Sequence, residues 1–269
     1  KSSQIDFKTF KIINLNKNFE IIGKSGISEG RILYFTHLPS TQNWILKNLD
    51  LIVPGDIIWT TNQTAGKGRL HKRWITLPHA CLTFSLIVKA FSNNTLNTLI
   101  TQISAVTIGD FLESLGIKYV FKWPNDILIN NKKVAGIKAD YQNILKIIII
   151  GIGINVNLSE EQIDSLPIEQ PITSLQIEKH NKYDMKNLLF QCLSVFKQNL
   201  DIIPRDGKNY FLDKLRKNSY LKRRDILQVK VDNKVIRGNY QGIDTEGRIQ
   251  IQDSKNHLHK FWSGELITL

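Results

Sequence analysis

The feature that most constrains the fold is the apolar run at residues 147–154, in which isoleucine is interrupted only by Gly151 and Gly153. A short continuous run rich in β-branched residues predicts a buried β-strand. Its length is far below the ~18 residues that a membrane-spanning helix needs. Glycines within such a strand are typical of places where a ligand or another backbone approaches closely. We therefore expect a buried strand beside a binding site.

Further strands are predicted on both sides of this run. Residues 119–154 as a whole resemble a set of β-strands, with turns at Asn130-Asn131 and at Gln142-Asn143. Residues 56–61 and 82–88 are predicted to form two more strands upstream. Together these segments indicate one sheet of several strands.

Helices are predicted between and after the strands. Apolar residues recur mostly every three or four positions through residues 96–115, which predicts a long amphipathic helix. Ser40 or Thr41 can cap a short helix, and Asp184 can cap a later one. A further short helix is expected near residues 210–215.

The pattern changes after Lys217. Residues 227–231 and 248–252 alternate between apolar and polar, residues 232–234 form a predicted turn, and residues 261–267 close the chain. Short strands with tight turns and no helix predict a small β-barrel of about 50 residues. The predicted fold class is α+β, a mixed sheet with flanking helices and an all-β appendix. The predicted parts are an N-terminal segment or linker remnant at 1–33, a catalytic domain at 34–218 and the barrel at 219–269.

The amino-acid composition limits which binding partners and which cellular compartment are expected. The 36 basic and 24 acidic residues give a net charge of +12, which suits a nucleic acid, a nucleotide substrate or an acidic protein partner. Cys81 and Cys192 are too far apart for a C-x-x-C metal site and too few for a disulfide framework. With no signal peptide and no membrane segment, the sequence predicts a cytoplasmic protein.

The most unusual segment is residues 63–74, where two glycines flank Lys67 and four cations lie within seven residues. Glycines let backbone N–H groups approach an anion, and the cations can neutralise phosphate charge. The segment is not a Walker loop, because Thr61 and Gly68 stand where that motif needs Gly and Ser or Thr. The alternative is a basic loop without a ligand.

Three more motifs follow in order. Residues 122–126 read Lys-Trp-Pro-Asn-Asp, residues 133–137 read Lys-Val-Ala-Gly-Ile, and residues 151–155 read Gly-Ile-Gly-Ile-Asn. Each motif alone is weak evidence for a ligand site, and the first could simply form the corner of a β-hairpin. The combination with the basic glycine loop, in this order, is a strong signal for a ligand site.

These motifs resemble those of the biotin–protein ligase family, the biotin–[acetyl-CoA-carboxylase] ligases. The resemblance runs from about Tyr34 to Leu269 and includes Ser40-Thr41 and the closing residues 262–265. It implies a mixed-sheet catalytic domain of the class II synthetase type and a C-terminal SH3-like β-barrel. It also implies biotin and Mg²⁺-ATP as ligands and a biotin carboxyl carrier protein or domain as the partner.

The resemblance implies a reaction in two steps. Biotin and ATP form biotinyl-5′-AMP, and a specific lysine of the carrier then takes the biotinyl group. Two alternatives stay open: a lipoate–protein ligase, which shares the fold and the adenylation, and a basic nucleic-acid-binding module.

Roles for individual residues come from the same resemblance. Lys133 and Arg69 are the expected catalytic residues, with Lys133 contacting the biotin carboxylate and the α-phosphate. The expected biotin contacts are Ser40, Thr41, Gln42, Gln63, Gly66, Lys67, Gly68, Arg69, Lys133, Gly136, Gly151 and Gly153. The expected nucleotide contacts are Lys72, Trp74, Lys122, Asn125 and Asn155. Asp126 is the expected Mg²⁺ partner.

The chain departs from the family pattern at four positions. Lys67 and Lys72 stand where the family usually has Arg, which keeps the charge but loses the bidentate fork. Gln42 stands where Asn is usual, and Lys138 stands where an apolar residue is common. All four residues are expected to contribute to the walls of the ligand site, so the contacts that these walls make with a ligand are expected to differ from the family pattern.

Many bacterial members of the family also carry an N-terminal winged helix-turn-helix that represses genes. The residues ahead of Tyr34 are too few for that module, so we expect a ligase that does not bind DNA. The sequence leaves open whether the chain is a monomer or a homodimer.

Overall fold

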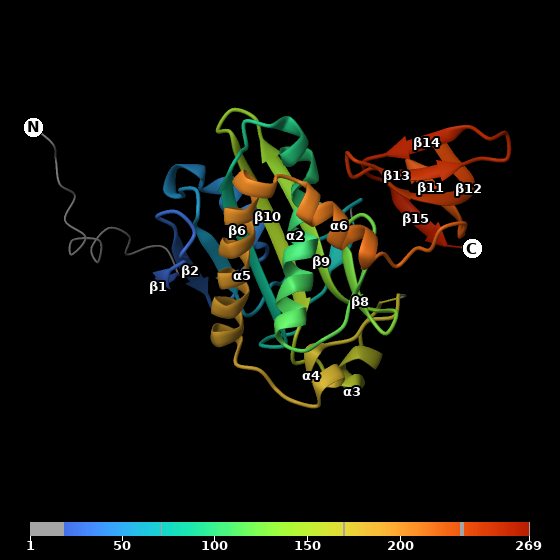
Figure 1. The fold of residues 1–269 in the computed structure, drawn as a ribbon. Helices are drawn as coiled ribbons and strands as arrows, with labels where there is room; N and C mark the ends of the chain where they lie inside the picture. Colours follow the sequence, from blue (N-terminus) through green and yellow to red (C-terminus); the bar gives the residue numbers. More distant parts are fainter. Residues whose placement is uncertain (1–18, 71, 169, 232–233, 269) are drawn as a thin grey trace, which may run out of the picture.

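The computed structural model describes residues 19–70, 72–168, 170–231 and 234–268 (Figure 1). Its centre is an eight-stranded mixed sheet with the order β1-β2-β3-β6-β10-β9-β8-β7. Only the β2–β3 pair is parallel in this sheet. The strands are β1 (Glu20–Lys24), β2 (Arg31–Phe35), β3 (Ile57–Thr60), β6 (Cys81–Lys89), β7 (Val120–Lys122), β8 (Asp126–Ile129), β9 (Lys132–Gln142) and β10 (Ile147–Asn155).

The predicted buried strand is β10, which pairs with β6 on one side and β9 on the other along its whole length. Its isoleucines are buried because both faces of the sheet are covered. Ile148 and Ile150 belong to the main core, whereas Ile147 and Ile149 belong to a second core that includes Ile45 of α1. This arrangement explains why the run shows no alternation of apolar and polar residues.

The predicted helices are confirmed. They are α1 (Thr41–Lys47), α2 (Asn94–Ser114), α5 (Met185–Asp206) and α6 (Asn209–Lys217). Ser40 and Asp184 cap α1 and α5: Ser40 Oγ accepts from Asn43 N at 3.4 Å, and Asp184 Oδ1 accepts from Asn187 N at 2.8 Å. The sequence pattern missed the short helices α3 (Glu160–Asp164), α4 (Leu175–Lys179) and η2 (Leu49–Leu51). Among the described helices, none combines the length and apolar character that crossing a bilayer would require.

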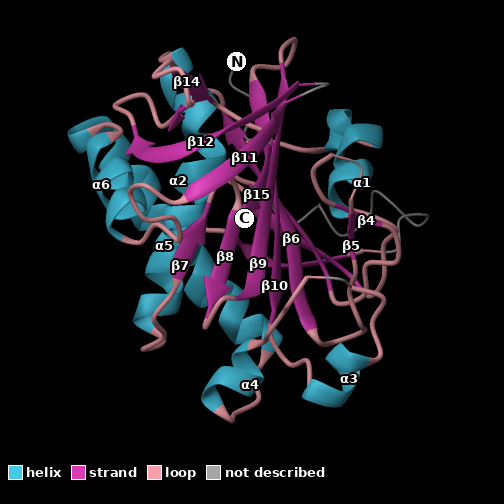
Figure 2. Ribbon diagram, turned by 90° about the vertical axis from the view of Figure 1, so that its right-hand side faces the viewer, coloured by secondary structure: helices cyan, strands magenta, loops and turns pink. Residues whose placement is uncertain are grey.

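The helices divide the sheet into two faces. Helices α2 and α5 cover one face, and α1 lies on the other together with the two-stranded ribbon of β4 (Gly66–Lys67) and β5 (Arg73–Trp74) (Figure 2). The ribbon contains the basic glycine segment predicted above. The face that carries it is therefore the one on which a ligand site can open.

The C-terminal part is a five-stranded antiparallel sheet with the order β14-β13-β12-β11-β15, a small barrel-like domain. Its strands are β11 (Ile226–Val231), β12 (Lys234–Ile243), β13 (Ile249–Gln252), β14 (Leu258–Phe261) and β15 (Glu265–Thr268). Leu227, Val229, Ile249 and Ile251 are fully buried, as the alternating pattern predicts. The predicted turn includes residues 232–233, which lie outside the described residues.

The eight-stranded sheet begins upstream of the predicted domain boundary at residue 34. That boundary falls inside β2, and β1 pairs with β2 as an antiparallel hairpin at the edge of the sheet. Residues 1–18 of the predicted N-terminal segment lie outside the described residues. The strand register therefore assigns residues 20–33 to the sheet.

Candidate active site

A cleft opens on the α1 face of the sheet and brings together nearly all the predicted site residues. The lining includes Ser40, Thr41, Gln42, Gln63, Lys67, Gly68, Arg69, Lys72, Trp74, Lys122, Asn125, Asp126, Lys133, Gly136, Gly151, Gly153 and Asn155. Gly66 lies behind Trp74 in the ribbon, where it pairs with that residue. The floor is made by β9 and β10, in which Gly136 pairs with Gly153.

One end of the cleft is a buried hydrogen-bonded group from α1, from the segment that follows β3 and from β6. Gln63 Oε1 accepts from Thr41 N at 3.0 Å, and Thr41 Oγ1 lies 2.7 Å from Ser85 Oγ. A Cβ on Gly66 would lie only 2.5 Å from Gln63 Nε2. The carbonyl of the Gln63 amide is thus occupied, and its N–H₂ group faces the ribbon. Ser40 Oγ accepts the cap hydrogen bond, which leaves its own hydrogen available to a ligand.

Gly136, Gly151 and Gly153 form a glycine floor, where glycine is required because other side chains lie directly against the backbone. A Cβ on Gly153 would lie 2.3 Å from Trp74 Cε2, and a Cβ on Gly136 would lie 3.2 Å from Trp74 Cζ3. A Cβ on Gly151 would lie 2.7 Å from Gln42 Cδ. In this structure the Trp74 indole and the Gln42 amide occupy the surface that the resemblance reserves for a ligand. Both must shift if a ligand is to rest on the glycines.

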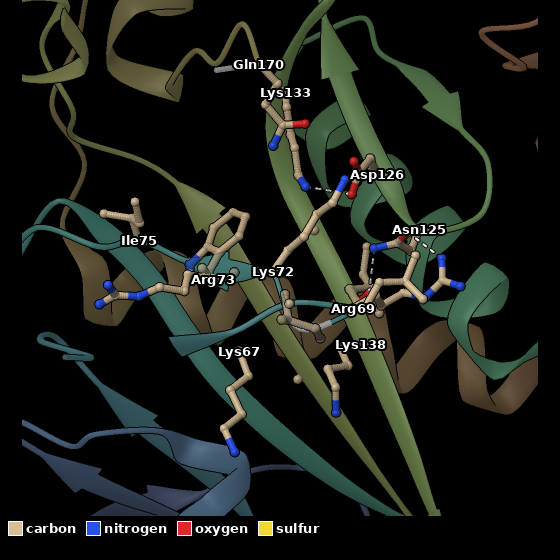
Figure 3. A pocket seen from close by; sticks show the side chains of 18 of the residues that line it. Lys67, Arg69, Lys72, Arg73, Ile75, Asn125, Asp126, Lys133, Lys138 and Gln170 are labelled. Atoms are coloured by element: carbon tan, nitrogen blue, oxygen red, sulfur yellow. Dashed lines mark hydrogen bonds and ion pairs between the residues drawn. The ribbon is translucent and has the colours of Figure 1, made fainter. Parts of the chain in front are cut away.

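Lys133 and Asp126 form an ion pair at the opposite end of the cleft (Figure 3). Lys133 Nζ lies 2.8 Å from Asp126 Oδ1, in a geometry that is not that of a hydrogen bond, and both side chains are mostly buried. The Lys133 ammonium also lies 5.7 Å from the centroid of the Trp74 ring. The fold thus holds one cation in a defined place between the glycine floor and a carboxylate.

Asn125 positions Arg69. The Arg69 Nη1 group donates to Asn125 Oδ1 at 3.0 Å, and Asn125 Nδ2 donates to the Ile137 carbonyl at 3.0 Å (Figure 3). Burial lowers the pKa of Arg69, and the negative charge of Asp126 opposes that shift. The guanidinium is still charged at neutral pH, so Arg69 brings a second cation to the same end as Lys133.

Asn155 has a positioning role in this structure. Its Nδ2 donates to the carbonyl of Thr173 at 3.0 Å and to that of Lys133 at 3.4 Å. Its Oδ1 accepts from Cys81 Sγ at 3.8 Å, and burial raises the pKa of the Cys81 thiol to about 12. The Asn155 amide therefore links β10 to the main chain of Lys133. Its predicted contact with the nucleotide stays a prediction.

The C-terminal domain reaches the cleft through Glu265. Lys72 Nζ of the basic ribbon segment lies 2.5 Å from Glu265 Oε1 at the start of β15. Lys122 lies with its ammonium 5.8 Å from the ring centroid of Tyr220. Two of the predicted nucleotide contacts, Lys72 and Lys122, thus contact residues of the C-terminal region.

The Lys72–Glu265 pair should make a small, pH-dependent contribution to stability. Hydrogen bonding and charge attraction from Lys72 hold the pKa of Glu265 below its ordinary value. A lowered carboxylate pKa stabilises the fold above the pKa of the unfolded state, and this stabilisation is lost as pH falls through the folded-state pKa. Because the pair is largely exposed, we expect less than about 1 kcal/mol.

The measurement is the melting temperature of Glu265→Gln against the parent chain, at low salt and at several pH values. The variant should melt slightly lower at pH 7, and the difference should vanish in acid below the Glu265 pKa. The exposed Glu29→Gln serves as the control. A difference that is the same at all pH values would contradict the ion pair.

Several lining residues were not predicted. Among them are Thr83, Ile168, Gln170, Ile172, Glu265 and Leu266. Glu265 belongs to the closing motif at residues 262–265, which was a usable signal. The segment near Ile172 has no motif and reaches the site by pairing with Lys133: Lys133 N donates to the Pro171 carbonyl at 2.9 Å.

Comparisons with known proteins agree with this architecture. Residues 33–155 match the biotin/lipoate A/B protein ligase family. The bifunctional ligase/repressor BirA of Bacillus subtilis is 28% identical over 251 residues, covering 90% of this chain and 75% of that protein. The BirA protein of Escherichia coli is 23% identical over 254 residues, covering 93% and 77%. The biotin protein ligase of Aquifex aeolicus in complex with biotin and ATP superposes with a TM-score of 0.73 at 25% identity, covering 87% and 97%.

The mixed eight-stranded sheet with its helices and the appended five-stranded sheet match the architecture of the biotin protein ligases. The chain carries, over residues 33–155, a domain of the biotin/lipoate A/B protein ligase family.

Proposed function

We propose that the chain is an ATP-dependent biotin–protein ligase. It forms biotinyl-5′-AMP from biotin and ATP, and then transfers the biotinyl group to a lysine of a carboxylase biotin carrier domain. The observation that carries this proposal is the arrangement of the cleft. The Lys133 cation is fixed at one end of the glycine floor, and a buried polar pocket lies at the other end. Relatives named as biotin ligases favour biotin over lipoate as the acid.

The polar pocket supplies directional groups for the ring system. Ser40 and Gln63 offer donors that the protein itself leaves unused, as described above. The floor adds two buried polar atoms, Trp74 Nε1 and Thr83 Oγ1, which have no hydrogen-bond partner within the described part of the chain. Buried polar atoms are nearly always paired, so this floor is suited to a ligand that brings partners.

In the first step the chain contributes position and charge. A biotin carboxylate oxygen attacks the α-phosphorus of ATP, the new P–O bond forms, and pyrophosphate leaves. In this proposal Lys133 and Arg69 stabilise the negative charge that accumulates on the phosphate, and the support for it is that each cation is held by a protein partner, Asp126 or Asn125. Preorganised cations of this kind lower the barrier without a nucleophile or base from the protein.

The family also implies Mg²⁺. The described residues contain no cluster of three or more His, Cys, Asp or Glu side chains that could hold a metal ion by themselves. Mg²⁺ commonly binds through one or two carboxylates together with substrate phosphates, and Asp126 fits that mode. Asp126 would hold the ion, which would neutralise phosphate charge. The contact between Lys133 Nζ and Asp126 Oδ1 at 2.8 Å holds that carboxylate in place at this end of the cleft.

In the second step the carrier lysine attacks the carbonyl carbon of the mixed anhydride. The amide C–N bond forms, the acyl C–O bond breaks, AMP leaves and the amine loses a proton. The ribbon of β4 and β5 lies over the floor, with the Trp74 indole on the glycines, so it can shield the anhydride from water. Cys81 and Cys192 are both buried and unpaired, which supports the cytoplasm as the place of the reaction.

The test is isotope exchange between ATP and pyrophosphate with biotin, with lipoate, or with neither acid. Exchange only with biotin is the expected result, because only the matching acid completes the first step. Exchange only with lipoate would assign the chain to the lipoate ligases. No exchange, together with a shift of labelled nucleic acid in a gel, would support the nucleic-acid-binding alternative instead.

A further inference from the structure

The chain between the middle of α6 and the start of β11 is strongly basic. Residues 214–224 contain six lysines and arginines and no acidic residue. Lys214 and Arg216 are neutralised by acidic side chains of α2 and α6. The other four cations are exposed and form no ion pair with any residue that the structure describes; these four, the basic strip, are Lys217, Lys222, Arg223 and Arg224. Arg224 keeps its charge although its φ of 78° lies in the region that favours glycine.

The basic strip borders the Lys133 end of the cleft. The linker from α6 to the C-terminal sheet (Figure 1) runs along β7, the edge strand of the mixed sheet, where Tyr220 N donates to the Phe121 carbonyl at 2.8 Å. The next residue of β7, Lys122, is in register with Asp126, which pairs with Lys133. Residues of the strip precede and follow the Tyr220 contact in the chain. Four unpaired cations therefore lie at the edge of the sheet that leads to the reactive end of the cleft.

The second step of the proposed reaction brings a macromolecule to this same end. The carbon that the carrier lysine attacks belongs to the former biotin carboxylate, which the proposed function places at Lys133. A lysine ammonium sits on a stem of only four carbons, so the body of the carrier must come close to the mouth of the cleft. The surface that borders this end must then face the carrier.

We propose that the basic strip is a docking surface for the carrier domain, which it binds through acidic side chains near the acceptor lysine. This inference rests on the proposed function. Exposed cations of one sign attract a partner of opposite charge, raise the rate of encounter and fix its orientation. Individual exposed ion pairs add little affinity, so the strip acts mainly on the association of the carrier and not on the formation of the adenylate.

The experiment reverses three charges of the strip and measures the two steps of the reaction separately. In Lys222→Glu/Arg223→Glu/Arg224→Glu, kcat/KM for biotin transfer to the carrier domain of a bacterial acetyl-CoA carboxylase should fall by about tenfold or more. Biotin-dependent exchange between ATP and pyrophosphate should be unchanged, which also shows that the variant is folded. The matched control makes the same change of charge on exposed lysines at and near α5, on the opposite face of the sheet, and should leave both steps unchanged: Lys182→Glu/Lys186→Glu/Lys197→Glu.

Salt provides a second measurement, on the parent chain alone. Raising the salt concentration from about 50 to 500 mM shortens the distance over which exposed charges attract each other. The value of kcat/KM for the carrier should therefore fall steeply, and much less steeply in the triple variant. A fall of the same size in the parent and in the triple variant would contradict the role of the strip.

The other outcomes separate this inference from the proposed function. Equal transfer by the parent, the triple variant and the control, with biotin-dependent exchange present, would overturn the docking surface and leave the ligase function standing. A loss of exchange as large as the loss of transfer would assign the strip to the nucleotide and overturn the proposal. Weaker binding of labelled DNA with unchanged transfer would assign the strip to a nucleic acid instead. A parent chain without biotin-dependent exchange would overturn the proposed function itself.

Discussion

Replacing Lys133 by alanine slows the formation of biotinyl-adenylate by about a hundredfold or more, the usual effect of deleting a preorganised group that stabilises transition-state charge. The Lys133 side chain is 14% exposed and is held between Asp126 and the Trp74 ring. Its main chain is fixed by Pro171 and Thr173 on both sides. The cation is therefore held in a defined place, and the alanine variant removes the charge that Lys133 supplies there.

The rate is measured as adenylate formed in a single turnover with saturating biotin and Mg-ATP. Lys132→Ala is the matched control, because Lys132 is the exposed neighbour on the same strand. The melting temperature shows whether Lys133→Ala is folded, since Asp126 loses its partner in this variant. Lys133→Arg keeps the charge and should recover part of the rate. An alanine variant within a few-fold of the parent rate would refute the assignment.

Replacing Asp56 by alanine destabilises the fold by about 3–5 kcal/mol, the typical effect of removing one partner of a buried ion pair. Asp56 is fully buried and accepts four hydrogen bonds. Arg31 donates three of them, from its main-chain N at 2.7 Å, from Nε at 3.1 Å and from Nη2 at 2.6 Å. Val53 N donates the fourth at 3.0 Å. The carboxylate also raises the pKa of Arg31.

The effect should be large because the contacts cannot rearrange. Next to the pair, the backbones of Gly30 and Gly55 touch, so that a Cβ on Gly30 would lie 1.9 Å from the Gly55 carbonyl carbon. The alanine variant leaves a guanidinium and two N–H groups without their acceptor. The free energy of unfolding from urea titration measures the loss, with the exposed Asp50→Ala as the control. A loss below about 1 kcal/mol would show that water replaces the carboxylate.

The Arg31–Asp56 pair also matters for the site. It joins the start of β2 to the turn before β3, and β3 leads directly to Gln63 in the polar pocket. We expect that Asp56→Ala weakens biotin binding only as far as it unfolds the chain. The pair stabilises the sheet from which the binding residues project.

Most of the secondary structure could be predicted because it follows from local patterns. The periodicity of residues 96–115 and the caps at Ser40 and Asp184 appear in the structure as α2, α1 and α5. The short helices α3 and α4 were missed because five residues carry too little periodicity. The edge strand β1 was missed because its pairing with β2 depends on a register that no local motif encodes.

The residues that line the cleft were also largely predicted, but the hydrogen bonds that they make within the protein were not. The resemblance grouped Asn125, Asn155 and Trp74 as nucleotide contacts, yet in the structure the two amides serve Arg69 and the main chain of Lys133. Trp74 lies on Gly153 and Gly136. A side-chain amide can bond to a ligand or to the protein, and only the distances in the folded chain decide between them.

Local periodicity and short motifs act over a few residues, so they predicted most of the strands and helices, the buried run of β10 and the motifs that meet at one site. The pairing of Lys72 with Glu265 and of Lys133 with Asp126, and the place of Lys138 across from Gly151, depend on the folded chain. The Lys72–Glu265 contact joins residues that are 193 positions apart. Such contacts depend on how the sheet and the C-terminal domain pack, and packing is a property of the whole chain rather than of any segment.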